Sequence, residues 1–341
     1  MNNGPLAITT TGMVTGVGFD AQNSCAAIRA TLDNFQETRF KDHAGNWLLG
    51  CQVPLKEGTC GSEKLVAMLT MAISECMASA KVSLSSTPLL ICLPEIHRPG
   101  IPANQGNQIY FKTEQQLGCR FHTDSLVIKH GRAGGLIALE KARQLIYEHQ
   151  HQQVIVAGVD SLLNARTLRH FEQQHQLLTS RNSDGFVPGE AAAALLVEKP
   201  VNNSRLVCLG IGFGQETATF DSEEPLQANG LKDAVSMALN QAQLSMTEID
   251  FRIADMSGGQ YWFKESALLL SKLLRVHKEG FPLWLPADCT GEVGAATAPL
   301  AISYLVNAFE NDFSNGPRVL QHCSNDDGYR AAAVFQFGGT E

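Results

Sequence analysis

Two segments rich in glycine and alanine hold the residues best placed to do chemistry. One reads Gly131-Arg132-Ala133-Gly134-Gly135-Leu136, and the other reads Gly291-Glu292-Val293-Gly294-Ala295-Ala296. Each opens a predicted helix whose small residues indicate burial and a close approach of two backbones. The N-terminus of a helix has free N–H groups and a partial positive charge, so it binds anions or stabilises an oxyanion. We therefore expect any chemistry to lie where these two helix starts converge.

Cysteine and histidine predict no metal site, no disulfide and no bound cofactor. The nine cysteines include no CxxC pair, and the ten histidines are scattered. Zinc sites use clustered ligands at short spacing, whereas free cysteines behave as small buried hydrophobes in a reducing compartment. The stretch 148–153 contains His149 and His151, but residues two apart do not share a helix face, so we expect a solvated helix end there. These patterns favour a metal-free, cytoplasmic protein.

The composition excludes several classes of protein. The chain has 341 residues, of which 44% are hydrophobic and 18% charged, with a net charge of −8. That balance excludes a disordered chain, and an evenly acidic surface disfavours nucleic-acid binding. No stretch approaches the ~18 apolar residues of a membrane-spanning helix, and the start 1–5 lacks the pattern of a secretory signal.

Short apolar runs alternate along the sequence with longer periodic segments, which predicts an α/β protein whose strands and helices position these residues. Strands are expected over 6–11, 88–93, 125–129, 153–157, 191–198, 205–211, 249–254, 282–285, 317–322 and 330–337. Helices are expected over 21–30, 62–81, 132–150, 228–243, 262–276 and 293–310. The segment 94–123, with three prolines, is expected to be irregular and to cap either the pocket or a dimer surface, of which the dimer surface is favoured.

The same order of elements recurs on either side of the joint 199–204. In each part a helix leads into a buried strand, then a glycine-started helix, and finally an alanine-rich strand, 191–198 in one part and 331–337 in the other. Such self-similarity indicates a duplicated unit. We therefore predict two domains, 1–200 and 205–341, each one α/β half.

Three stretches carry a resemblance to a known family. They are 8–18 at the N-terminus, Val156-Ala157-Gly158-Val159-Asp160-Ser161, and Asp184-Gly185-Phe186-Val187-Pro188-Gly189-Glu190-Ala191. The last is similar to the DGFVxGEGA run of the β-ketoacyl (3-oxoacyl-ACP) synthases, which have the thiolase fold. The resemblance implies two duplicated α/β halves in five layers, α-β-α-β-α, with two central buried helices.

The same resemblance implies that the family's catalytic residues are replaced. Arg132 stands where the family has the cysteine that accepts the acyl group, and arginine cannot accept one. Met256 and Glu292 stand at the two histidines, and Ala287 stands at the upstream lysine. The family's Gly-Phe-Gly-Gly loop reads 324–328 here. We therefore expect no catalytic residues and interpret the chain as a pseudoenzyme.

The replacements predict a specific contact. Arg132 and Glu292 are expected to occupy equivalent places in the repeat and to form a salt bridge that fills the former reaction chamber. A buried arginine needs carboxylate partners to offset its desolvation. Asp255 or Asp288 is a further candidate acceptor.

Several functional alternatives remain open at this point. The non-enzymatic reading is a scaffold or adaptor, or a silent partner subunit like a chain-length factor. The enzymatic one is an acyltransferase with an altered site, in which Arg132 grips a malonyl carboxylate or Cys323, near Cys289, acts as acid/base.

The candidate partners follow from the family. They are a second copy of the chain joined through strand 125–129, a ketosynthase, an acyl carrier, or an adaptor or effector of a bacterial secretion system. An apolar edge strand needs a cover, which favours the homodimer.

Overall fold

The computed structural model describes residues 4–80, 82–202 and 204–338. Residues 81 and 203, which fall in the predicted helix 62–81 and the joint 199–204, lie outside the described residues, as do 1–3 of the N-terminal start. None of the described helices is both long and apolar enough to cross a membrane.

Strands and helices follow the predicted alternation. The strands are β1 (Leu6–Thr15), β2 (Phe35–Lys41), β3 (Trp47–Cys51), β4 (Leu89–Leu93), β5 (Leu126–Lys129), β6 (Gln153–Ser161), β7 (Glu190–Glu198), β8 (Leu206–Gln215), β9 (Phe251–Ala254), β10 (Leu283–Trp284), β11 (Arg318–Ser324) and β12 (Tyr329–Phe337). The α-helices are α1 (Ala21–Arg29), α2 (Gly61–Ala78), α3 (Gln105–Leu117), α4 (Gly134–Tyr147), α5 (Ala165–Gln173), α6 (Asn229–Ala242), α7 (Gln260–Leu273), α8 (Ala287–Thr290) and α9 (Thr297–Glu310). Short 3₁₀ turns are η1 (Gly131–Ala133), η2 (Met246–Glu248) and η3 (Gly294–Ala296).

The main sheet has ten strands in the order β10-β9-β11-β12-β8-β1-β7-β6-β4-β5. The pattern of strand directions is the same on both sides of the contact between β8 and β1. On each side the first two neighbouring pairs are antiparallel and the next two are parallel. The two halves meet where Leu6–Ile8 pairs with Leu206–Cys208. The predicted duplication of the fold is confirmed, whereas the division into domains at 200 and 205 stays a prediction.

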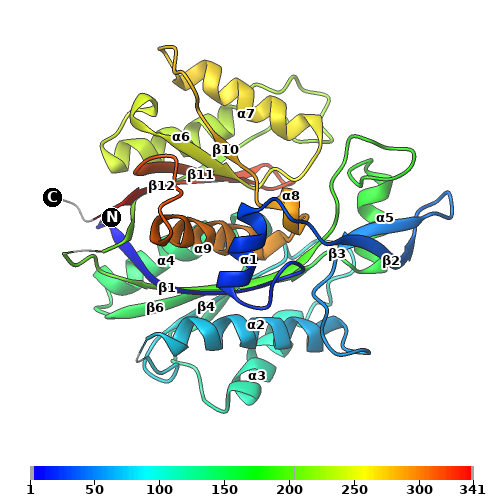
Figure 1. Ribbon diagram of the computed structural model, residues 1–341, viewed down its shortest axis with the longest axis horizontal. Helices are drawn as coiled ribbons and strands as arrows, with labels where there is room; N and C mark the ends of the chain where they lie inside the picture. The colour runs from blue at the N-terminus through cyan, green and yellow to red at the C-terminus, as the bar shows by residue number, and fades with distance from the viewer. Residues whose placement is uncertain (1–3, 81, 203, 339–341) are drawn as a thin grey trace.

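Five layers are visible in Figure 1, from α6 and α7 at the top to α2 and α3 at the bottom, with α4 and α9 between the two halves of the sheet. Strand residues alternate between layers, as period-two geometry requires. In β6, Val154 and Val156 face the central helices, and Ile155 and Ala157 face α2. Both faces of the sheet are therefore buried, and the predicted α-β-α-β-α arrangement with two central buried helices is confirmed.

Several elements depart from the sequence prediction. The segment 94–123 is not irregular throughout, because it contains α3, which buries Ile109 and Thr113. The hairpin β2–β3 and the helix α5 were not predicted, because β2 has mostly polar residues and α5 is short. The central helices also begin later than expected, each after a 3₁₀ turn.

Candidate functional site

The starts of the two central helices converge in the middle of the molecule. A Cβ added at Gly135 of α4 would lie 2.8 Å from the Cβ of Ala298 in α9, so only glycine permits this approach. The turns η1 and η3 begin with Gly131 and Gly294, whose φ angles are +50° and +51°. The predicted convergence is confirmed.

The predicted equivalence of Arg132 and Glu292 within the repeat is wrong. When the two left-handed glycines, Gly131 and Gly294, are superimposed, Arg132 corresponds to Ala295, and Glu292 corresponds to Lys129. The error arises because both segments are rich in glycine, so matching Gly131 to Gly291 looks equally good in the sequence. Conformation distinguishes the two glycines: Gly291 combines its φ of +68° with an extended ψ of −174° and ends α8.

Arg132 is nevertheless paired with Glu292, as predicted. Its Nη1 lies 3.5 Å from Glu292 Oε2, and its Nε lies 3.7 Å from Asp255 Oδ2. A third carboxylate, Asp326, is 2.5 Å from Nη2. The guanidinium also lies over the Trp262 ring at 4.6 Å, a cation–π distance. Arg132 is only 7% exposed, so these partners replace its water.

The charges in this cluster perturb one another. Burial acts to lower the pKa of Arg132, but Asp326, Glu292 and Asp255 more than offset it, so its pKa is raised and it stays protonated. Burial raises the pKa of Asp255 to about 7, although Arg132 and the N–H of Ser324 oppose that change. Burial also raises the pKa of Asp326. One cation is thus surrounded by three carboxylates, of which Asp255 titrates near neutrality.

Glu292 is held by the backbone of the family-like run 184–191. Its N–H donates to Val187 O at 2.8 Å, and its carbonyl accepts from Gly189 N at 2.8 Å. Its side chain accepts from Gly294 N at 2.9 Å and from the hydroxyl of Ser257 at 2.8 Å. The motif that carries the resemblance therefore fixes the carboxylate at the start of η3.

Each central helix start is capped by a side chain from the other half of the fold. Asn325, after β11, accepts from Ala133 N at 3.0 Å and donates to His130 O at 2.8 Å. Asp160, at the end of β6, accepts from Ala295 N at 2.9 Å. Arg98 pairs with Asp160 at 2.5 Å and so balances the second cap. These contacts satisfy helix N–H groups that would otherwise be orphaned.

The remaining predicted residues lie around this cluster. Met256 is buried beside Ala254 and Trp262, and Ala287 begins the short helix α8. Asp288 is exposed and, among the described residues, forms no ion pair with Arg132. Asp326, Arg98 and Trp262 were missed by the sequence analysis. For Asp326 a signal existed, because the acidic pair 326–327 stands within the segment matched to the family's loop.

The two candidate reactive thiols are buried. Cys323 is 1% exposed and Cys289 is 3% exposed. Burial raises the pKa of Cys323 well above its usual value and raises that of Cys289 to about 11. Since the thiolate is the reactive form, neither cysteine is prepared to react.

Free space beside the cluster differs between its two sides. The cavity beside Asp255 and Glu292 has a volume of about 10 Å³, room for no more than one water. A larger pocket of about 360 Å³, lined in part by Ile96, His130 and Asp326, lies on the other side of Asp326. The cluster therefore leaves no room for an acyl chain beside Asp255 and Glu292, but it borders this open pocket at Asp326, whose side chain is 40% exposed.

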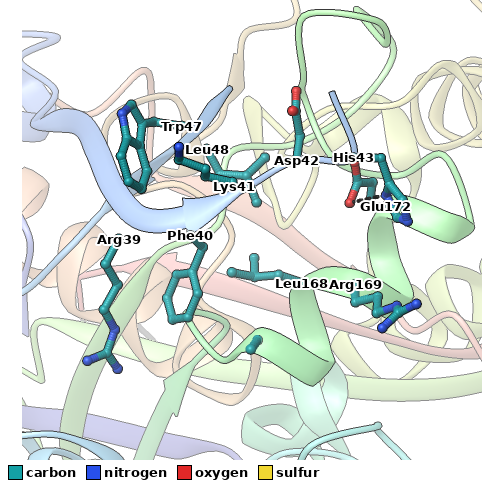
Figure 2. Close-up of a pocket in the computed structure, with 11 residues that line it drawn as sticks. Arg39, Phe40, Lys41, Asp42, His43, Trp47, Leu48, Leu168, Arg169 and Glu172 are labelled. Atoms are coloured by element: carbon teal, nitrogen blue, oxygen red, sulfur yellow. Dashed lines mark hydrogen bonds and ion pairs between the residues drawn. The ribbon is translucent and has the colours of Figure 1, made fainter. Parts of the chain in front are cut away.

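A separate open pocket of about 610 Å³ lies between the β2–β3 hairpin and α5. Figure 2 shows Phe40 of the hairpin facing Leu168 of α5 across it. At its rim His43 Nδ1 and Glu172 Oε2 are 2.6 Å apart. It shares no residue with the Arg132 cluster.

Comparisons with known proteins agree with this architecture. Residues 119–202 match the model of the β-ketoacyl synthase N-terminal domain. No curated protein sequence matches the chain.

Several solved structures are similar over almost their whole length. The ishigamide ketosynthase/chain length factor has a TM-score of 0.73 and 18% identity, covering 98% of this chain and 100% of that one. A type II polyketide synthase ketosynthase in complex with its acyl-carrier protein (AntDE:AntF) has a TM-score of 0.80 and 15% identity, covering 97% and 99%. The ketosynthase ApeO in complex with its chain length factor ApeC, from Xenorhabdus doucetiae, has a TM-score of 0.74 and 13% identity, covering 98% of both chains. The chain therefore has the thiolase-like fold of the ketosynthases.

Proposed function

We propose that this chain is a catalytically silent, ketosynthase-like protein that acts as a partner subunit rather than as an acyltransferase. The observation that carries the proposal is the Arg132 cluster. A guanidinium engaged by Glu292, Asp255 and Asp326 occupies the start of α4, where the resemblance implies a nucleophilic cysteine. A protonated arginine neither attacks a thioester nor carries an acyl group.

The space around the cluster supports the same proposal. A cavity of about 10 Å³ beside Asp255 and Glu292 does not accommodate an acyl chain. The carboxylate of Glu292 would also repel a malonyl carboxylate that approached Arg132. The alternative of an altered acyltransferase would need this cluster to open.

The partner surface we propose is β5, the end strand of the ten-stranded sheet. Leu126 and Val127 of this strand are only half-buried, and an apolar edge strand pairs readily with another chain. A second copy pairing through 125–129 would extend the sheet across a twofold axis. The similar solved structures that contain a ketosynthase with its chain length factor support a ketosynthase as the alternative occupant of the same edge.

Thioester assays test the proposed silence. Purified protein is incubated with acetyl-CoA and malonyl-CoA, and with the same groups on an acyl carrier, while CO₂ release and condensation products are measured. We expect rates equal to those without protein. Decarboxylation or product formation that requires the protein, and that Arg132→Met changes, would establish the acyltransferase instead.

Light scattering tests the proposed partner surface. We expect a dimeric mass at micromolar concentration for the native chain, and a monomeric, folded species for Val127→Lys. Val201→Lys is the matched control, because Val201 is 66% exposed on the connection between β7 and β8 and should leave the mass unchanged. A native monomer that becomes a heterodimer with a co-expressed ketosynthase would replace the homodimer by the silent-subunit arrangement.

A further inference from the structure

Two histidines and an aspartate from separate segments meet near the end of the sheet that carries β5. His122 and Asp124 lie in the turn before β5, and His151 lies between α4 and β6. The sequence analysis expected a solvated helix end at His149 and His151, but α4 ends at Tyr147, so neither residue is helical. The expected solvated helix end is therefore wrong for His151, whose side chain is 15% exposed and packs toward the other segment.

The three side chains offer ligand atoms in a compact group. His151 Nε2 lies 2.7 Å from Asp124 Oδ2, and His122 Nδ1 lies 3.8 Å from the same oxygen. The two imidazole rings meet edge to face with centroids 4.9 Å apart. One ligand atom from each residue lies within 4.8 Å of the other two. The group therefore converges on one point rather than forming a single ion pair.

We propose that His122, Asp124 and His151 form a binding site for a divalent transition-metal ion, with Zn²⁺ as the best fit. Two imidazoles and a carboxylate are a donor set that Zn²⁺ accepts, usually with a fourth position left for water. At metal–ligand distances of about 2.0–2.2 Å, tetrahedral ligand atoms are about 3.3 Å apart. The separations between Asp124 Oδ2 and the two imidazole nitrogens, 2.7 and 3.8 Å, bracket that value, and the ligand atoms of the two histidines lie within 4.8 Å of each other.

The surroundings favour a cation at this point. Asp124 Oδ2 is the atom that both imidazoles approach, so a carboxylate oxygen lies between the two rings. The N–H of Asp124 donates to His122 Nδ1 at 3.1 Å. Coordination through Nδ1 replaces that one bond with a metal bond. The backbone N–H of His122 donates to Leu84 O at 2.9 Å, which anchors the turn.

A metal here would join the turn before β5 to the start of β6, two strands that β4 separates in the sheet. The bound metal would fix the position of the N-terminal end of the edge strand β5. The site shares no residue with the Arg132 cluster, so it does not depend on the proposed lack of catalytic activity.

Metal titration tests the proposal. Zn²⁺ binding is measured by calorimetry on the full chain carrying Cys60→Ser, which removes the exposed thiol as a competing ligand. We expect one ion per chain, with an affinity that falls about tenfold or more in His122→Asn, Asp124→Asn and His151→Asn. His277→Ala, which removes an exposed histidine between α7 and β10, is the control and should bind as tightly as the parent.

A thermal measurement keeps the test decisive if a variant is less stable. Saturating Zn²⁺ should raise the melting temperature of the parent but not that of Asp124→Asn, because only a ligand bound to the folded state stabilises it. Absence of stoichiometric binding would overturn the proposal. Binding that all three substitutions leave unchanged would overturn it equally.

Discussion

The two central helices begin with the same geometry but with different charges. At the start of α9 a carboxylate, Asp160, accepts the helix N–H of Ala295, and Arg98 neutralises it. At the start of α4 an amide, Asn325, accepts the N–H of Ala133, and Arg132 is placed beside it among three carboxylates. The helix dipole favours the first arrangement and opposes the cation in the second.

The unusual arrangement of charges is the one at the start of α4. An Asp at a helix N-terminus is stabilised by the helix itself, so the α9 start needs only one arginine. The arginine at the α4 start is opposed by the helix and relies on carboxylates from three different segments, Glu292, Asp255 and Asp326, together with the Trp262 ring. The α4 start therefore depends on long-range ion pairs. Substitutions in these pairs should destabilise the protein more than substitutions at the α9 start.

The largest effect is expected for Arg132→Met. Removing the cation leaves the buried carboxyl groups of Glu292 and Asp255 and the partly exposed Asp326 without their cationic partner, which costs about 3–5 kcal/mol of unfolding free energy. Urea unfolding measures the loss. The matched control is Arg120→Met, since Arg120 is 86% exposed in its side chain and its pair with Glu114 is expected to contribute about 0–1 kcal/mol. A loss of under about 1 kcal/mol for Arg132→Met would contradict the cluster.

Asp255→Asn should change how stability depends on pH. Burial raises the pKa of Asp255 from 3.8 to about 7, so between these values the native state holds a proton that the unfolded state has released. The stability this group contributes is present below pH ~4 and is lost as the pH rises through about 7, by at most about 1.4 kcal/mol per pH unit.

The check is unfolding of both proteins from pH 4 to pH 8. The native chain should lose stability relative to Asp255→Asn across that range, because the variant lacks the titrating group. Parallel curves for the two proteins would show that Asp255 does not titrate in this window.

Asp160→Asn should cost less than Arg132→Met. The substitution removes the carboxylate that binds Arg98 and caps η3, but Arg98 keeps Glu95 at 3.7 Å as a second partner. We expect a loss of about 2 kcal/mol, typical of a hydrogen bond to a charged group, measured by urea unfolding. A loss of unfolding free energy larger than that of Arg132→Met would contradict the expectation that the α4 start depends more on its ion pairs than the α9 start does.

Asn325→Ala should have the smallest effect of the four. It removes the cap of α4 without leaving a charge unpaired, so about 1 kcal/mol is expected. Hydrogen exchange at Ala133 and Gly134 is the sharper measurement, since both amides should exchange faster while the start of α9 is unchanged. Unchanged exchange at the start of α4 would mean that Asn325 is not its cap.

The sequence predicted the central helices and the repeat because runs of glycine and alanine are what two closely packed, buried helices require. It also predicted the pair between Arg132 and Glu292, because an arginine in a small-residue helix requires a carboxylate. Asp326 was missed because a charged loop residue looks solvated until the fold brings it to Arg132. The hairpin β2–β3 was missed because β2 is mostly polar and β3 has only five residues.

Intact-protein mass spectrometry after incubation with malonyl- and acetyl-CoA tests the central claim most directly. The ion cluster around Arg132 and the buried thiols of Cys289 and Cys323 predict no acyl adduct at neutral pH. A stoichiometric acetyl or malonyl adduct on a residue of the central helix starts would contradict the claim that this ketosynthase-like site is silent.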